Sequence, residues 1–169
     1  MRKPTGNWSA LLLLAAFIVC PKPAEGCSEA RNSVTEVLTS PSDAVVTARF
    51  GPAHSPVRNT VQLHTGWDYG AAMGDPVRAA AAGSVTYAGY KSGYGNIIII
   101  SHGDDLDTAY AHLRRIDLDV GTCVDRGNIV GLVGSTGLVD TPHLHFEVRK
   151  NGAPVDPVMW FRTQRRNEE

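Results

Sequence analysis

Two histidines that lie two residues apart near the C-terminal end of the chain are the first candidates for chemistry. They stand in residues 142–147 (PHLHFE), where one apolar residue separates them and another follows. This alternation is typical of a half-buried strand, whose side chains at i and i+2 share one face. His143 and His145 are therefore expected to face one cavity, where two imidazoles can hold a metal ion or divide metal binding and proton transfer between them.

A second segment, residues 63–68 (LHTGWD), offers a histidine and an aspartate four residues apart. Gly66 and its β-type neighbours argue against a helix, so we expect a strand that bends at Gly66 and brings His64 and Asp68 to one point. Zn²⁺ accepts imidazole nitrogen and carboxylate oxygen at about 2.0–2.2 Å. These two side chains and one histidine of residues 142–147 would leave a coordination position open, which is typical of catalytic zinc. Taken alone, residues 63–68 are more typical of a hydrogen-bonded turn.

The other three histidines stand in different contexts. Residues 106–113 (LDTAYAHL) predict a strand on which Tyr110 and His112 share one face. Tyr110 is expected to pack in the fold, and from the face that it shares with His112 its side chain could orient that ring. Taken alone, His112 also fits a hydrogen-bonded histidine on a half-buried strand. His54 and His102 have no partner pattern and are expected to be ordinary loop or turn residues.

The elements that must position these side chains are predicted to be β-strands. Seventeen glycines and ten prolines, with only 20% charged residues, indicate many turns. Strands are predicted over residues 44–50, 83–89, 96–101, 106–113, 128–134 and 143–149. The run 96–101 (NIIIIS) predicts a central, doubly buried strand, which forms a hairpin with 106–113. Turns are predicted at Gly51-Pro52 and, as a two-residue hairpin turn, at Asn151-Gly152. The sequence therefore predicts a single, mainly β domain with an antiparallel sheet.

The N-terminal residues are typical of an export signal. Arg2 and Lys3 precede an apolar run over residues 10–19 (ALLLLAAFIV), which is shorter than the roughly 20 residues that span a bilayer. We predict a signal peptide over 1–26, a polar linker over 27–43, the domain over 44–160 and a charged tail over 161–169, with no stable membrane span. Acylation of Cys20 or Cys27, as in a lipoprotein, is the competing interpretation.

Cysteine count and charge restrict the class of protein further. Removal of a signal peptide would leave Cys27 and Cys123, an even count that fits one disulfide bond in an oxidising compartment, although two unpaired cysteines fit the sequence as well. The formal net charge is −1, and basic and acidic residues are mixed along the chain. A nucleic-acid binder would concentrate basic residues, so we expect no nucleic-acid partner.

Five motifs follow one another between residues 50 and 160. They are His-x-x-x-Asp, Gly-Tyr-Gly-Asn before a β-branched run, Tyr-x-His-Leu, Gly-x-x-Gly-Ser-Thr-Gly, and Pro-His-Leu-His-Phe-Glu. In this order they resemble the LytM or lysostaphin-type zinc metallopeptidases, most of which cut peptides of bacterial peptidoglycan. The resemblance implies a LytM-like peptidase fold, in which an antiparallel sheet floors a groove that loops wall in.

The resemblance also implies a role for each candidate side chain. His64, Asp68 and His145 would bind one Zn²⁺ per chain, and His112 and His143 would flank the zinc-bound water as catalytic residues. Zinc lowers the pKa of such a water towards about 7 and polarises the scissile carbonyl. One imidazole would take the water's proton, and the other would stabilise the oxyanion or protonate the leaving amine. The sequence does not assign these two tasks between His112 and His143.

Supporting residues and one departure complete the comparison with the family. Asn96 is expected to cap a turn, and Glu147 to bond the backbone or a group behind the metal ligands. The family usually has a small residue followed by glycine before the histidine motif, whereas Asp140 and Thr141 precede Pro142 here. This difference is expected to reshape the groove or to add a carboxylate near the metal.

The resemblance suggests a substrate and a location. We expect a zinc-dependent endopeptidase that cuts peptidoglycan cross-link peptides in the periplasm, with D,D-endopeptidase activity on a D-Ala–diaminopimelate link; the alternative bond is a glycine bridge. A regulatory protein partner is also compatible with the family. One competing hypothesis is a non-catalytic regulator that binds and activates a cell-wall amidase. Another is a metal-stabilised binding module with four protein ligands and no open position.

Overall fold

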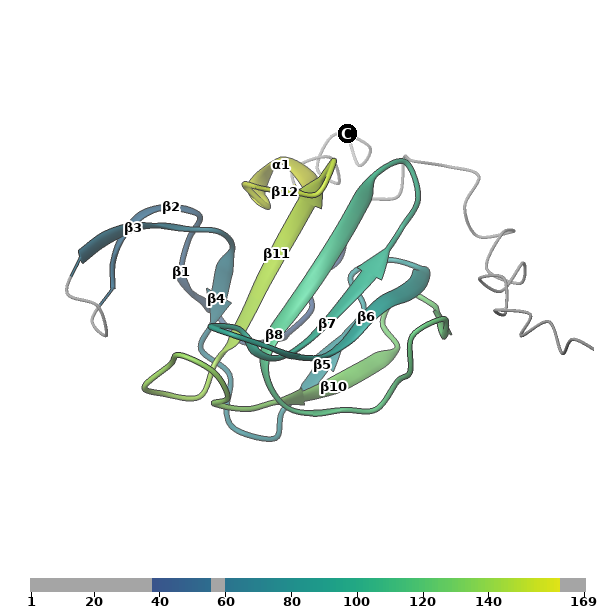
Figure 1. Cartoon of the computed structure of the whole chain (residues 1–169), viewed down its shortest axis with the longest axis horizontal. Helices are drawn as coiled ribbons and strands as arrows, with labels where there is room; N and C mark the ends of the chain where they lie inside the picture. The colour runs from purple at the N-terminus through teal and green to yellow at the C-terminus, as the bar shows by residue number, and fades with distance from the viewer. Residues whose placement is uncertain (1–37, 56–59, 162–169) are drawn as a thin grey trace, which may run out of the picture.

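An antiparallel sheet of ten strands dominates the computed structural model, which describes residues 38–55 and 60–161 (Figure 1). Seven strands follow one another across the sheet in the order β1 (Val46–Ala48), β4 (Trp67–Tyr69), β11 (Leu144–Lys150), β8 (Leu106–Ile116), β7 (Gly95–Ser101), β6 (Gly83–Lys91) and β9 (Cys123–Val124). Three more strands complete it: β10 (Ile129–Val133) pairs with β5 (Pro76–Arg78) and β8, and β12 (Ala153–Val155) pairs with β11. A separate hairpin joins β2 (Gly51–Ser55) and β3 (Thr60–His64), and one short helix, α1 (Val158–Phe161), follows β12. The prediction of a mainly β domain with an antiparallel sheet is confirmed.

The main hydrophobic core lies between the long central strands and the β5–β10 pair, which crosses below them in Figure 1. Along β11, Leu144, Phe146 and Val148 are fully buried in this core. Because successive side chains of a strand point to opposite faces, His145 and Glu147 lie on the other face of the sheet. The alternation in the sequence of β11 thus separates residues that stabilise the fold from residues that can form a site.

Several elements lie where the sequence predicts them. The isoleucine run forms β7, in which Ile97, Ile98 and Ile100 are fully buried, and β7 pairs with β8 as a hairpin. Between β11 and β12, Asn151 and Gly152 have φ values of 50° and 75°. Both values are positive, as the predicted two-residue hairpin turn requires.

The turn predicted at Gly51-Pro52 is wrong, because these residues begin strand β2. Gly51 has a φ of 131°, and its partner in the β2–β3 ladder is His64. Glycine adopts such a backbone conformation at no steric cost, so the chain continues into a strand here instead of reversing. The strand predicted over 44–50 is shorter in the structure, where β1 covers Val46–Ala48.

The packed domain extends beyond its predicted boundaries at both ends. Leu38, assigned to the polar linker, is 1% exposed in the main core, and the backbone of Thr39 bonds that of Ala80. Phe161, assigned to the charged tail, stacks on Trp67 with ring centroids 5.3 Å apart. A buried leucine and a stacked phenylalanine provide apolar contacts that the polar composition of their neighbours conceals.

Other sequence predictions concern residues outside the described part. The signal peptide, residues 27–37 of the linker and residues 162–169 of the tail all lie there. Cys123 is disulfide-bonded, while Cys27, its expected partner, lies outside the described residues. Within 38–55 and 60–161, no helix is long and apolar enough to cross a membrane.

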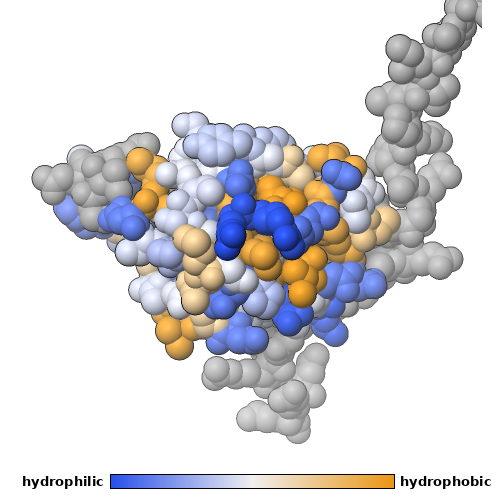
Figure 2. Space-filling view, turned by 90° about the horizontal axis from the view of Figure 1, so that it is seen from below, coloured by the Kyte–Doolittle hydropathy of each residue, from blue (hydrophilic) through white to orange (hydrophobic). Residues whose placement is uncertain are grey.

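The surface seen from below is mixed in character. Figure 2 shows a strongly hydrophilic strip beside a hydrophobic patch on this face. Val120, Ile129 and Leu138 are among the large hydrophobic side chains that the described part exposes to solvent. Hydrophobic side chains that are exposed singly are normal on a protein surface.

Candidate metal centre

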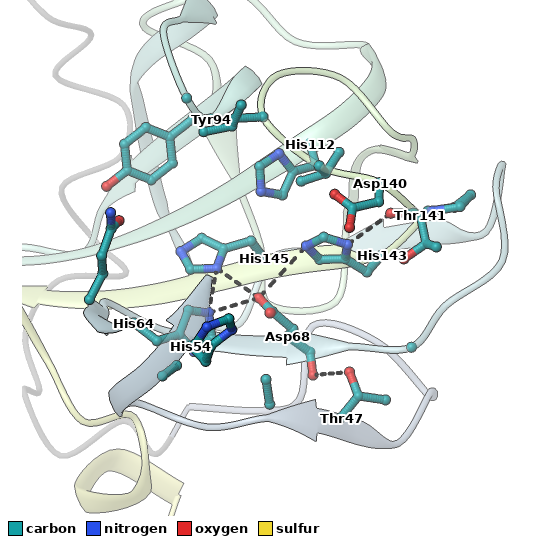
Figure 3. A pocket seen from close by; sticks show the side chains of 18 of the residues that line it. Thr47, His54, His64, Asp68, Tyr94, His112, Asp140, Thr141, His143 and His145 are labelled. Carbon is teal, nitrogen blue, oxygen red and sulfur yellow. Dashed lines mark hydrogen bonds and ion pairs between the residues drawn. The ribbon is translucent and has the colours of Figure 1, made fainter. Parts of the chain in front are cut away.

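Three side chains from three strands place their donor atoms within hydrogen-bonding distance of one another (Figure 3). The Nε2 atom of His64 lies 3.0 Å from Oδ1 of Asp68 and 3.1 Å from Nδ1 of His145. The Nδ1 atom of His145 lies 2.8 Å from the same carboxylate oxygen. The structure thus brings together the histidine–aspartate pair and one histidine of the strand motif.

Strand pairing explains why residues so far apart in the sequence meet. His145 on β11 is the direct cross-strand partner of Asp68 on β4, and cross-strand partners share one face of a sheet. His64 ends β3, and the chain bends at Gly66 before it enters β4. A Cβ atom at Gly66 would lie 2.2 Å from the carbonyl oxygen of Phe146, so only glycine fits this bend.

The second nitrogen of each ligand histidine is also occupied. The Nδ1–H of His64 donates to the carbonyl oxygen of Arg49 at 2.8 Å, and the Nε2–H of His145 donates to Oε1 of Glu147 at 3.2 Å. Because neither acceptor carries a proton, these bonds fix the tautomer of each ring in its neutral form, in which the lone pairs of His64 Nε2 and His145 Nδ1 are directed at the cluster. Metal-binding histidines typically show this arrangement. The donor set of two imidazoles and one carboxylate therefore fits a zinc-type ion.

Electrostatics in the cluster favours bound positive charge. Burial alone would raise the pKa of Asp68, but hydrogen bonds from His145 and His64 hold that pKa well below its usual range. Burial alone would lower the pKa of His145, but its bonds to Asp68 and Glu147 raise this pKa to about 9. The carboxylate of Asp68 consequently keeps its negative charge, which a cation at the three donor atoms would partly neutralise.

Two further imidazoles face the same pocket without belonging to the donor triangle. His143 lies immediately before β11, with its Nε2 atom 3.9 Å from Oδ1 of Asp68. The ring of His112 lies 4.8 Å from that of His143 and 5.8 Å from that of His145. The Nδ1–H of His112 donates to the carbonyl of Thr136, and that of His143 to the carbonyl of Thr141. In the neutral form of each ring, Nε2 is therefore the free proton acceptor.

The predicted common face of Tyr110 and His112 is wrong. Tyr110 is fully buried in the main core, whereas His112 lines the pocket on the opposite side of the sheet. The β7–β8 pairing slips between Asn96 and Ile98, and His112 has a φ of 61°. This β-bulge turns His112 to the face that strict alternation would assign to its neighbours. Tyr110 consequently cannot orient the His112 ring directly.

The pocket that contains all five residues has a volume of about 790 Å³. The β2–β3 hairpin lines one side of it and the loop over residues 138–142 another, and the loop includes Asp140 and Thr141. His54, expected to be an ordinary loop residue, lies on β2 and also lines the pocket. No sequence pattern indicated this position for His54, whose partner in the β2–β3 ladder is the apolar Val61.

His102 lies outside this pocket. Its Nδ1 atom lies 2.7 Å from the carbonyl oxygen of Ala82, and its Nε2 atom lies 2.7 Å from the hydroxyl of Thr108. These contacts match the structural role expected of it.

The residues behind His145 were only partly predicted. Glu147 was expected to bond the backbone or a group behind the metal ligands, but it contacts His145 itself. Its contacts with Thr65, Tyr94 and Arg149 were not predicted. A signal for Arg149 existed, because His145, Glu147 and Arg149 alternate along one strand and must share a face. No local pattern could reveal Thr65 and Tyr94, which come from other elements.

Comparisons with known proteins agree with this geometry. Residues 62–157 match the model of peptidase family M23. A relative from Neisseria meningitidis, the DD-carboxypeptidase/endopeptidase Mpg, is 47% identical over 113 residues, which cover 67% of this chain and 26% of the relative. The chain thus spans about a quarter of the length of the curated relative.

Two solved structures share the architecture. A zinc-containing peptidase from Vibrio cholerae has a TM-score of 0.67 and 34% identity, over 72% of this chain and 39% of that one. The catalytic domain of lysostaphin from Staphylococcus simulans has a TM-score of 0.65 and 30% identity, over 71% of this chain and 93% of that domain.

Proposed function

Because the chain belongs to peptidase family M23, we propose that it is a zinc-dependent endopeptidase that hydrolyses peptide cross-links of bacterial peptidoglycan. The observation that carries this proposal is the arrangement of two different histidine pairs around one carboxylate. His64 and His145 direct their lone pairs at the cluster with Asp68, whereas His112 and His143 face the same pocket and remain outside the triangle. A merely structural metal site would not need the second pair.

The residues that would hold zinc are His64, Asp68 and His145. When bound, the ion acidifies water and polarises a carbonyl oxygen. The protein's part is to present three donors and to leave the side of the cluster that faces the pocket accessible. The exposed fractions of the His64 and Asp68 side chains are 15% and 21%, so a small substrate group can reach this side.

His112 and His143 would handle the protons of the reaction. Burial lowers the pKa of His112 to about 4, although its bond to Thr136 opposes this, so the ring is neutral at physiological pH. A neutral imidazole with its Nε2 lone pair in the pocket can accept a proton from water and can later return it to a leaving amine. In the protonated form the same nitrogen can donate a hydrogen bond to a developing oxyanion.

The relatives support the choice of substrate. The name of the Neisseria protein specifies DD-carboxypeptidase and endopeptidase activity, so we propose a bond between D-configured residues of the cross-link as the target. The pocket, between the β2–β3 hairpin and the 138–142 loop, has room for a peptide segment. The regulator hypothesis is less favoured, because a protein without catalytic activity would not need all five candidate residues in place.

A direct experiment tests the function. We expect purified residues 27–169 to contain about one zinc per chain and to release new amino termini from purified cell walls. His143→Ala should retain zinc and abolish the release, whereas His145→Ala should lose both. The proposal would be contradicted by an active His143→Ala protein, or by a wild-type protein that holds zinc and releases no new amino termini. Mass spectrometry of the fragments identifies the bond that is cut.

A further inference from the structure

Glu147 is a fully buried carboxylate next to the metal centre. The roles proposed for the five candidate site residues do not explain why a carboxylate lies there. Its exposed fraction is 0%, although a carboxylate is rarely buried without partners. It lies on β11 two residues beyond His145, so both side chains project from the same face of the sheet. A buried charge in this position needs several donors to offset its lost hydration.

Four donors meet at this carboxylate, two from β11 itself and two from the segments between β3 and β4 and between β6 and β7. Oε1 accepts hydrogen bonds from Nε2 of His145 at 3.2 Å, from the Thr65 hydroxyl at 2.5 Å and from the Tyr94 hydroxyl at 3.0 Å. Oε2 accepts from Nε of Arg149 at 2.7 Å and forms an ion pair with Nη2 at 2.6 Å. Arg149 balances the charge of Glu147, and the other donors fix the position of Oε1.

The position of Oε1 decides which nitrogen of His145 faces the metal. In the neutral, metal-binding form of His145, the carboxylate of Glu147 can only accept and therefore keeps the proton on Nε2. The lone pair is then on Nδ1, the atom that lies 2.8 Å from Asp68 at the metal centre. Thr65 lies between β3 and β4, and Tyr94 between β6 and β7. Their hydroxyls therefore anchor this orientation to the two segments that flank β11 and β8.

We propose that Glu147 is a positioning residue that fixes the orientation and tautomer of His145 for metal binding, and that Thr65, Tyr94 and Arg149 hold Glu147 in place. This inference rests on the proposed function, because it assigns His145 to a metal ion. It extends that function from the metal ligands to the groups behind them. It also explains why Tyr94, which lines the pocket, turns its hydroxyl toward the sheet instead of the substrate groove.

Metal affinity tests the proposal without using catalysis. The dissociation constant for Zn²⁺ is measured by competition with a chromophoric chelator, at one pH, for wild type and variants. Glu147→Leu removes the acceptor at similar size and should weaken zinc binding by roughly 10–100-fold. Glu147→Gln keeps one acceptor oxygen without the charge and should give a smaller loss. Thr65→Val and Tyr94→Phe each remove one anchor and should weaken binding several-fold.

A matched control separates positioning from general damage. Tyr87→Phe removes a tyrosine hydroxyl that bonds only the backbone of Tyr90 among the described residues, and it should leave zinc affinity unchanged. The visible spectrum of the Co²⁺-loaded protein reports ligand geometry. It should change in Glu147→Leu and Tyr94→Phe and stay as in wild type for Tyr87→Phe.

The outcomes distinguish this proposal from the proposed function. A folded Glu147→Leu protein with wild-type zinc affinity and Co²⁺ spectrum would overturn the positioning role, even if the wild type cuts peptidoglycan. If Glu147→Leu does not fold, wild-type affinity and spectrum in both Thr65→Val and Tyr94→Phe would overturn it instead. Conversely, weakened metal binding in these variants would support it even if the wild type released no peptides.

Discussion

The histidines of the site have the same side chain but different hydrogen-bond partners. His145 and His112 are both buried, yet their pKa values move in opposite directions. Two carboxylates, Asp68 and Glu147, contact His145, whereas a backbone carbonyl is the hydrogen-bond partner of His112. A carboxylate favours the protonated ring and burial disfavours it, so the partner decides the sign of the shift. The residues suited to bind a cation and to accept a proton are thereby separated within one pocket.

This difference predicts the titration of His112. Because burial lowers its pKa to about 4, the ring should remain neutral from about pH 5 upward, with the proton on Nδ1. A ¹⁵N NMR titration of the imidazole nitrogens in the zinc-loaded protein measures both quantities. A His112 midpoint near its ordinary value of about 6.5 would contradict the prediction.

The predictability of the site from the sequence also differs from residue to residue. His143 and His145 could be placed on one face because a regular strand alternates with period two. His64 and Asp68 could be paired because Gly66 marks a bend. The face of His112 could not be predicted, because the bulge that reverses it depends on the pairing of β8 with β7 and not on the local residues.

At the scale of elements, the bend between β3 and β4 lies very close to the backbone of β11. The β3–β4 bend passes so close to β11 that a Cβ atom at Gly66 would collide with the carbonyl of Phe146, next to His145. This close approach accompanies the β4–β11 pairing that places Asp68 opposite His145. Elements with a regular pattern, such as β7 and β8, were predictable, whereas the β2–β3 hairpin was not, since residues 60–63 are exposed and carry no buried pattern.

The close approach at Gly66 predicts a large effect of one methyl group. Gly66→Ala would place Cβ 2.2 Å from a backbone oxygen that cannot move alone, so β4 or β11 must shift. We expect a loss of about 1–3 kcal/mol in the free energy of unfolding, together with weaker zinc binding. Chemical denaturation and a zinc competition assay measure the two effects.

A second glycine provides the control for this substitution. At Gly89 the nearest atom to an added Cβ is the hydroxyl of Tyr87 at 3.4 Å, the end of a flexible side chain. Gly89→Ala should therefore change the free energy of unfolding by less than about 0.5 kcal/mol and leave zinc affinity intact. Equal losses in both variants would show that the Gly66 contact has no special role.

At the scale of the whole molecule, the segment before β1 belongs to the folded unit. Leu38 is buried in the main core, and Arg78 on β5 donates its backbone N–H to the carbonyl of Pro41. The segment thus bonds the backbone of β5 and contributes a side chain to the main core. A polar composition predicted a linker here because one buried leucine among serines and prolines leaves no periodic signal.

This packing predicts that Leu38 contributes to global stability. Leu38→Ala should lower the free energy of unfolding by about 2–5 kcal/mol, the usual cost of such a cavity. Val45→Ala, at a side chain that is 74% exposed, should change it by less than about 0.5 kcal/mol. Thermal and denaturant unfolding of both variants provide the comparison. A Leu38→Ala protein as stable as Val45→Ala would mean that the segment only rests on the surface.

The metal centre joins β3, β4 and β11, so its charge state should affect the stability of the entire domain. In the metal-free protein, contacts with Asp68 and Glu147 outweigh burial and raise the pKa of His145 to about 9. A raised pKa in the folded state means that the ion pairs stabilise the fold fully below about pH 6.5, the unfolded value, and that this contribution is lost as the pH rises through about 9. We therefore expect the free energy of unfolding of the metal-free protein to fall between about pH 7 and 10 by an amount on the order of 1–3 kcal/mol. Its Tm should fall over the same range.

Zinc should abolish this alkaline loss, because the ion supplies positive charge to the same carboxylates without a proton to release. Zinc-dependent stabilisation should accordingly increase from about pH 7 to 9, since the ion competes less with protons for His145 as the pH rises. Calorimetry of the metal-free and zinc-loaded protein across this range, with His145→Ala as the control that lacks the titrating group, measures the effect. If the two forms lost stability in parallel above pH 7, His145 would not be the group that couples the metal centre to the fold.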